Sequence, residues 1–245
     1  GLLSIGGWTL SFSILGGMGL LLAASLVLLP SWPHRQTKAE PKGSYLQLMR
    51  SPVFLRYALS QAFCVGGLIM FVFCAPVMFE RGLGGGLRDF ITMQVCGVAS
   101  FFIASNTAGW LVNRFGAERL IWTGTLLSTI SVSGMVVYAL AGMPEPVWVI
   151  LLFIPFNIGL GLRGPPGFLR AVIAADGQDD RGSSLVVLSI FATASGGTAL
   201  LAPVVEQGLF PVALSATVIE LAGLLLLWIL PSLPESEASE QSEGA

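Results

Sequence analysis

Long stretches without a charged residue recur along the chain and alternate with short polar segments. A charged side chain is costly at the middle of a bilayer, and about 20 apolar residues are needed to cross it, so each long stretch predicts a membrane-spanning helix. The predicted spans cover residues 8–29, 53–79, 90–112, 120–141, 146 to beyond Arg163, 184–205 and 211–230. The pattern predicts an all-α polytopic membrane protein with about seven transmembrane helices.

The composition agrees with this interpretation. Of the 245 residues, 54% are hydrophobic and only 11% are charged, whereas an average soluble domain has about 25% charged residues. The net charge of −2 provides no basic surface for nucleic acid. The lipid bilayer is therefore an expected partner, and nucleic acid is not.

Residues that could carry out catalysis or hold a metal ion are scarce. The one histidine, His34, lies in a polar loop, and the three cysteines have no CxxC spacing. An intramembrane serine or aspartyl enzyme would need a histidine or paired aspartates within its spans, but every aspartate lies in or beside a loop. We expect no enzyme, no metal site and no cofactor.

Lysine and arginine are distributed unequally between the two sides of the predicted helices. Ten lie on one side, and only Arg81 and Arg88 lie on the other. Basic flanks stay in the cytoplasm, so the side with ten is expected to be cytoplasmic. Residues 31–51 then form a cytoplasmic linker, and the acidic segment 232–245 forms a disordered cytoplasmic tail.

The turn between the third and fourth predicted spans has the most distinctive pattern. Gly109 allows close packing, Gly116 supplies a permissive backbone, and Arg114 and Arg119 anchor the inner face. The segment resembles the G-x-L-x-D-R-x-G-x-x-R motif of the major facilitator superfamily, in the copy that joins the eighth and ninth of twelve helices. Asn113 stands where the family usually has aspartate, which weakens an expected charge pair to a hydrogen bond.

Other segments match the same family in the same order. Residues 7–12 resemble the entry to its sixth helix, 51–57 the start of its seventh, 159–165 its tenth-helix pattern and 182–185 the entry to its eleventh. The set is most similar to the drug-efflux branch that confers bicyclomycin and chloramphenicol resistance. The resemblance implies that residues 1–30 hold the last helix of the N-terminal half. It also implies that 52–231 form the six-helix C-terminal domain, with helices one to five absent from this chain.

The resemblance further implies a function and a place for it. Such proteins rock two halves about a central site, so the chain is expected to be the C-terminal portion of a proton-coupled exporter of small amphipathic compounds in the bacterial inner membrane. Its partners would be a small-molecule substrate, protons and the missing N-terminal half, where the coupling acids of such exporters usually lie. The alternative is a membrane structural or assembly protein that is built from a transporter half and does not transport.

Three polar residues within the spans are candidates for the substrate cavity. Polar groups in spans either hold helices together or line a polar cavity. The resemblance places Gln61 and Asn157 on the seventh and tenth helices, which line the cavity. Arg163 is expected near the inner mouth, where its long side chain could instead extend to the cytoplasmic interface.

Two further patterns concern helix packing. Residues 159–164 are glycine-rich and precede Pro165 and Pro166, so we expect the helix to break there, either as a hinge or cavity-lining segment or as an ordinary terminus. In the third span small residues recur every four positions, which predicts a tightly packed helix face. These residues are Cys96, Ser100, Ala104 and Ala108.

Glu220 lies at the middle of the last predicted span. An acid at this depth is a functional candidate by default, so proton coupling is one interpretation. The resemblance instead places it on the twelfth helix, a peripheral support. The favoured expectation is a neutral carboxyl group that is hydrogen-bonded to a neighbouring helix.

Overall fold

The computed structural model describes residues 13–14, 16–22, 24–25, 43–142 and 145–233. The chain divides into two compact units, 1–41 and 42–245. In the first unit the described residues are helical. The rest of the predicted span 8–29 lies outside the described residues, as do most of the predicted linker and residues 234–245 of the tail.

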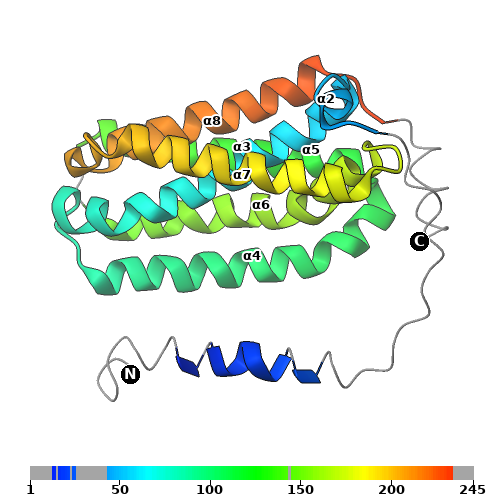
Figure 1. The fold of residues 1–245 in the computed structure, drawn as a ribbon. Coiled ribbons are helices and arrows are strands. Elements are labelled where there is room, and N and C mark those ends of the chain that lie inside the picture. The colour runs from blue at the N-terminus through cyan, green and yellow to red at the C-terminus, as the bar shows by residue number, and fades with distance from the viewer. Residues whose placement is uncertain (1–12, 15, 23, 26–42, 143–144, 234–245) are drawn as a thin grey trace. The chain divides into compact units, whose positions relative to one another are not determined.

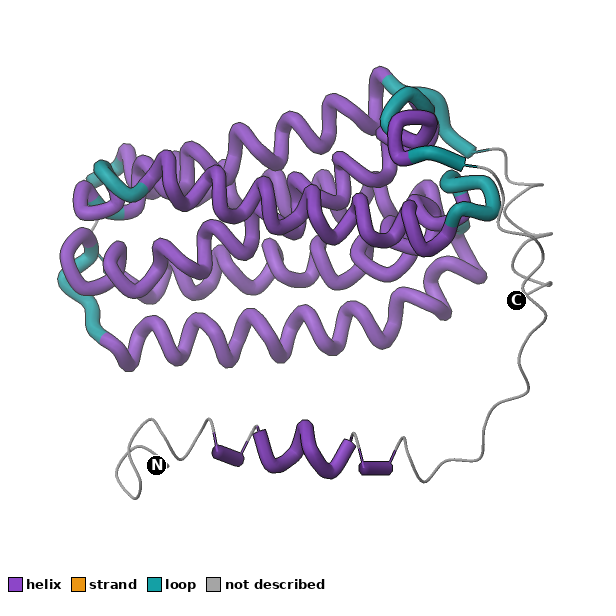
Figure 2. The backbone as a smooth tube through the Cα atoms, viewed as in Figure 1, coloured by secondary structure: helices purple, strands orange, loops and turns teal. Residues whose placement is uncertain are grey.

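The second unit is built from six long helices (Figures 1 and 2). They are α3 (Pro52–Val77), α4 (Leu87–Phe115), α5 (Ala117–Leu140), α6 (Pro146–Ile173), α7 (Asp179–Leu201) and α8 (Leu209–Ile229). Three short helices accompany them: α2 (Tyr45–Leu48), η1 (Met78–Gly82) and η2 (Val205–Gln207). Each of the six, with η1 continuing α3, is long and apolar enough to cross a membrane, which confirms the last six predicted spans.

Local sequence accounts for where these helices begin. Ser51 caps α3, its hydroxyl accepting a hydrogen bond from the Phe54 amide, and proline at the first helical position fits because that position has no intrahelical donor to lose. The carboxylate of Asp89 likewise accepts from the Gly86 amide at the start of α4. Gly116 adopts a φ of 86°, so α4 and α5 are joined by a single residue that reverses the chain.

The helices form two consecutive triplets, α3 to α5 and α6 to α8, and each triplet packs against the other. The first helix of the first triplet, α3, packs mainly on α7 and α8, and the first helix of the second triplet, α6, packs mainly on α4 and α5. The remaining large contacts join α5 to α8 and α3 to α6, which occupy equivalent positions in the two triplets. Each triplet has three spans, so the second begins at the opposite end of the bundle from the first. Inverted three-helix repeats have this arrangement.

The two ends of the bundle differ in charge as predicted. We call the end at which α3 begins and α8 ends the basic end. The described arginines at or beside it are Arg50, Arg56, Arg114, Arg119, Arg170 and Arg181, whereas Arg81 and Arg88 lie at the opposite end. The described arginines are therefore concentrated at one end of the bundle, as the sequence pattern predicted.

The expected break at Pro165 and Pro166 is wrong, because α6 runs without interruption from Pro146 to Ile173. A proline ring holds φ near the helical value, so it removes a hydrogen bond without forcing the chain out of the helix. The helices packed around α6 compensate for the backbone hydrogen bonds that the prolines cannot make. The alternative that this segment lines a cavity is confirmed below.

Close packing of α6 depends on glycine and other small residues. A Cβ atom on Gly159 would lie 2.5 Å from the Gly124 carbonyl oxygen of α5, and one on Gly161 would lie 2.6 Å from the Phe101 carbonyl oxygen of α4. On α4, Ala104 and Ala108 are buried, and the Ser100 hydroxyl donates to the Ile154 carbonyl of α6 at 3.4 Å. The small-residue face of α4 is therefore a packing face, as predicted.

Candidate substrate cavity and buried polar layer

A cavity of about 690 Å³ lies among α3, α4 and α6, a volume that suits a drug-sized molecule. Its lining is mostly aliphatic and aromatic, with two side chains that carry polar groups, Gln61 and Ser105. None of its lining residues is charged. The lining residues are Gln61, Val65, Leu68, Phe101, Ser105, Leu160, Gly164, Pro165, Phe168, Leu169 and Val172.

A second, smaller cavity of about 390 Å³ shares Leu68 with the first. Its polar lining residues are Gln94 and Asn157, and its lining again includes no charged side chain. The Asn157 amide donates to the Phe153 carbonyl of its own helix at 2.8 Å, so it does not join two helices. The structure therefore places Gln61 and Asn157 on adjoining cavities rather than in one.

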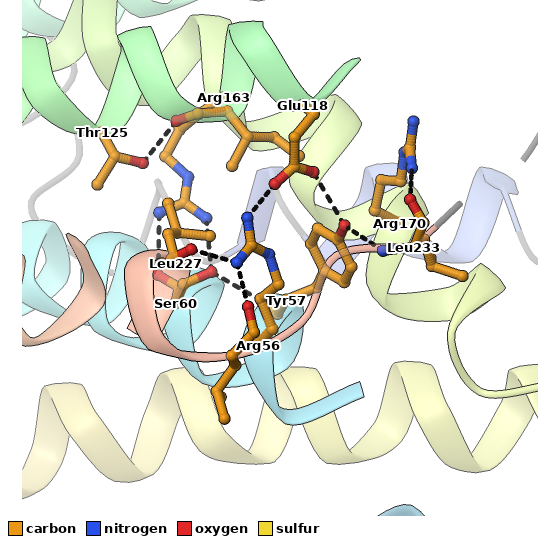
Figure 3. A network of polar contacts seen from close by, with 11 residues as sticks. Arg56, Tyr57, Ser60, Glu118, Thr125, Arg163, Arg170, Leu227 and Leu233 are labelled. Atoms are coloured by element: carbon orange, nitrogen blue, oxygen red, sulfur yellow. Dashed lines mark hydrogen bonds and ion pairs between the residues drawn. The ribbon is translucent and has the colours of Figure 1, made fainter. Parts of the chain in front are cut away.

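Arg163 is fully buried and points from α6 toward α3 (Figure 3). Its guanidinium group donates to the Ser60 carbonyl at 3.0 Å, to the Ser60 hydroxyl at 3.3 Å and to Gln61 Oε1 at 3.2 Å, and it contacts the Cys64 sulfur. The expectation that Arg163 extends to the interface is therefore wrong. Acceptors on α3 hold its two terminal nitrogens inside the bundle instead, because burial without hydrogen-bond partners would be costly.

Glu220 is also fully buried, between α8 and its neighbours. The Ser128 hydroxyl of α5 donates to Glu220 Oε2 at 2.9 Å, so the expected contact with a neighbouring helix is present. The Cys64 thiol, which contacts Arg163, also interacts with the Glu220 carboxyl group. Glu220 Oε1 and Arg163 Nε have no hydrogen-bond partner among the described residues.

These polar groups lie at one depth in the bundle. At 1.5 Å per residue, Gln61, Ser128, Arg163 and Glu220 are about 14 to 17 Å along their helices from the basic end. Four helices therefore contribute to a buried polar layer, which we define as Ser60, Gln61, Cys64, Ser128, Arg163 and Glu220. It connects the larger cavity, through Gln61, to Glu220 on α8.

A second network lies nearer the basic end and joins α3, α5 and the end of α8 (Figure 3). Arg56 donates to the carbonyl oxygens of Leu227 and Leu230 and forms an ion pair with Glu118. The Tyr57 hydroxyl donates to Glu118 Oε2 at 2.9 Å. We call Arg56, Tyr57 and Glu118 the basic-end clamp.

The clamp also holds the segment that follows α8. The Leu233 amide donates to the Tyr57 hydroxyl at 3.0 Å, and Arg170 of α6 lies 3.5 Å from the Leu233 carbonyl oxygen. Sequence reasoning did not single out the clamp. The available signal was a base near the start of α3 and an acid near the start of α5, and this pattern does not indicate that the two side chains meet.

The Gly109–Arg119 turn is only partly as predicted. Gly116 has the positive φ expected of it. No atom of another described helix lies within 4 Å of the position that a Cβ on Gly109 would take, so the described residues do not make the close packing expected there. Asn113 and Arg119 are exposed, and the Arg114 guanidinium group lies over the rings of Trp110 and Phe115. Glu118 joins this turn to α3, through the Arg56 guanidinium group and the Tyr57 hydroxyl.

No cluster of metal-ligating side chains occurs among the described residues. An α-helical bundle with six spans and an uncharged cavity between helices defines a polytopic membrane protein suited to binding small molecules. A sequence profile of the Major Facilitator Superfamily matches residues 1–203, so the chain belongs to this family of membrane transporters. No curated protein and no solved structure matches the chain.

Proposed function

We propose that the chain is the C-terminal portion of a secondary active transporter that exports small amphipathic compounds in exchange for protons. The observation that carries this proposal is the uncharged, largely apolar cavity among α3, α4 and α6 in a member of a transporter family. Gln61 and Asn157 are the substrate-cavity residues in this proposal. Arg163 acts from behind Gln61 rather than at the inner mouth.

The two triplets support the proposal that α3 to α8 are one six-helix half of a twelve-helix transporter. The match of residues 51–57 and of the Gly109–Arg119 turn to seventh-helix and eighth-to-ninth-helix patterns favours the C-terminal half. The N-terminal half is then the partner that completes the central site. The alternative of a non-transporting assembly protein has no feature among the described residues in its favour.

Expression in drug-sensitive bacteria tests export directly. Cells that carry the full-length gene should accumulate less of a neutral fluorescent amphiphile than cells with an empty vector, and a protonophore should remove the difference. Equal accumulation at confirmed membrane expression would contradict the proposal.

The proposed orientation places the basic end in the cytoplasm of a bacterium. In intact cells, cysteine introduced at the exposed Asn113 should be shielded from a membrane-impermeant maleimide, and cysteine introduced at the exposed Glu80 should be labelled. The half-buried Cys96 is replaced by alanine first, while the buried Cys64 and Cys74 stay in place. Labelling at 113 with protection at 80 would reverse the orientation.

The Gly109–Arg119 turn is proposed as a conformational gate. Gly116→Val should impair export while the protein still reaches the membrane, because a β-branched residue disfavours a φ of 86°. Gly142→Val is the matched control, since Gly142 also has a positive φ, 68°, but follows α5 at the opposite end of the bundle, and it should leave export unchanged. Normal export by Gly116→Val at normal abundance would show that the turn is only a connector.

Glu220 is the one acid buried within the described spans, and a coupling role for it can be tested. We expect Glu220→Gln to preserve expression, export and its pH dependence, because an amide oxygen can still accept the hydrogen bond from Ser128. The pH dependence is measured as export rate against external pH. Loss of proton-driven export at wild-type abundance would instead make Glu220 the coupling residue.

A further inference from the structure

The larger cavity presents two polar groups to a ligand. One is the side-chain amide of Gln61, which is only 4% exposed yet lines the cavity. The other is the Ser105 hydroxyl, which makes no hydrogen bond to another described residue. The rest of the lining is apolar, so these two groups decide which polar atoms of a ligand can be satisfied there.

Arg163 fixes the orientation of the Gln61 amide. A guanidinium group has only donors, so the atom of Gln61 that faces it, at 3.2 Å, must be the amide oxygen. A flip of the amide would place an NH₂ group against a cation and is therefore excluded. Gly167 lies beside the same oxygen and leaves it room, since a Cβ on this glycine would come within 2.6 Å of Oε1.

The amide nitrogen then has a defined role. One of its two hydrogens is directed to the Gly164 carbonyl oxygen, at a long 3.4 Å, and Gly164 itself lines the cavity. The second hydrogen has no protein acceptor among the described residues. Because the oxygen already accepts from Arg163 and faces Gly167, the free N–H group is what Gln61 mainly offers to a ligand.

We infer that this cavity is selective for a neutral, mainly apolar molecule that carries a carbonyl or ether oxygen. Gln61 donates to that oxygen, and Arg163 is a positioning residue that holds Gln61 in the donating orientation without touching the molecule. The inference rests on the proposed function in that it names the substrate class of the same site. It also excludes cations as preferred ligands of this half, because no carboxylate lines either cavity.

Three matched naphthalene probes test the selectivity in the full-length protein in lipid nanodiscs. They are 6-propionyl-2-(dimethylamino)naphthalene, its 6-propyl analogue without the carbonyl group, and its 2-trimethylammonio analogue. Binding is followed by energy transfer from tryptophan, with empty nanodiscs as the blank for partition into lipid. The ketone should bind about fivefold more tightly than the propyl compound, because it gains one hydrogen bond. The cation should bind most weakly.

Substitutions at Gln61 separate the donor from the packing. Gln61→Glu keeps the shape and gains an ion pair with Arg163 but offers only acceptors, so it should reduce the preference for the ketone to what the Ser105 hydroxyl alone can supply. Binding of the propyl compound should stay unchanged. Asn106→Leu is the matched control, because this exposed amide donates to the Phe102 carbonyl of its own helix and lines neither cavity.

The emission of the bound ketone reports on Arg163. A hydrogen bond to its carbonyl group shifts the emission to longer wavelength, so Arg163→Met should shift it to shorter wavelength, toward that of Gln61→Glu. Arg163→Lys, which keeps a donor at the amide oxygen, should restore the wild-type emission. Equal binding of ketone and propyl compound by the wild-type protein, or an undiminished preference in Gln61→Glu, would overturn the inference even if Arg163→Met fails to fold.

A failure of the proposed ligand selectivity can be distinguished from a failure of the proposed transport function. Active export without the ketone preference would overturn the inference and leave the transporter assignment in place. Ketone-selective binding without any export would support the proposed binding site but contradict the transport proposal.

Discussion

Arg56→Met should destabilise the folded protein by about 3 kcal/mol in free energy of unfolding, the range observed when one partner of a buried ion pair is removed. Arg56 is 4% exposed and donates to the last carbonyl groups of α8 as well as to Glu118. Its loss leaves the carbonyl oxygens of Leu227 and Leu230 without the donor that now satisfies them, in a region that water reaches poorly. The measurement is equilibrium unfolding of the purified protein in detergent.

Glu118→Gln is the control for this substitution. The glutamine oxygen still accepts from Tyr57 or Arg56, so we expect a loss well below that of Arg56→Met. Glu118 is also about a fifth exposed, and solvent screens the part of the interaction that depends on its charge. Equal losses in the two variants would show that the carboxylate charge, rather than the bonds to α8, holds this end together.

Gly159→Ala should lower the stability by about 2 kcal/mol, although alanine is a better helix former than glycine by about 1 kcal/mol. The new Cβ would lie 2.5 Å from the Gly124 carbonyl oxygen and 2.8 Å from the Ser128 amide nitrogen. Both are backbone atoms of α5, so relief requires the two helices to separate. The steric cost therefore outweighs the gain in helix propensity.

Gly196→Ala, within α7, is the matched control. No atom of a neighbouring helix lies within 4 Å of the position of its Cβ, so only the propensity acts and the variant should be as stable as wild type or more so. Thermal unfolding of both variants under one set of conditions makes the comparison. A stable Gly159→Ala protein would mean that α5 and α6 are not held as close as the structure has them.

The spans could be predicted from the sequence because their cause is local: a charge within a span is costly wherever the chain goes. The positive φ at Gly116 was predictable for the same reason, since an eleven-residue pattern contains all that the turn requires. Continuity of α6 through Pro165 was not predictable, because packing by other helices supports it.

The buried polar layer and the basic-end clamp depend on contacts between residues that are far apart in the sequence. Arg56 and Glu118 are separated by 62 positions, and Arg163 and Gln61 by 102. Sequence reasoning placed Gln61 and Arg163 among the cavity candidates but put the arginine near the inner mouth, with extension to the interface as the alternative, because a long charged side chain usually extends to water. The donors and acceptors that hold Arg163 inside became apparent only when α3 and α6 were seen side by side.

The clamp and the two triplets give the six helices cross-connections at several levels. Arg56 joins α3 to α5 and α8 near one end, and the polar layer joins α3, α5, α6 and α8 near the middle. We expect these helices to move as one body during transport, which is the behaviour that rocking of two halves requires. Substitutions in the clamp should then reduce stability and export together.

Substrate-dependent proton movement in proteoliposomes tests the central claim most directly. The purified full-length protein is reconstituted with a pH-sensitive dye trapped inside, and a pH gradient, acid inside, is imposed. Addition of the neutral ketone probe should dissipate the gradient faster than in protein-free liposomes, and Gln61→Glu should remove most of the acceleration. If the ketone produces no acceleration at confirmed reconstitution, the account of this chain as part of a proton-coupled exporter of neutral amphiphiles is wrong.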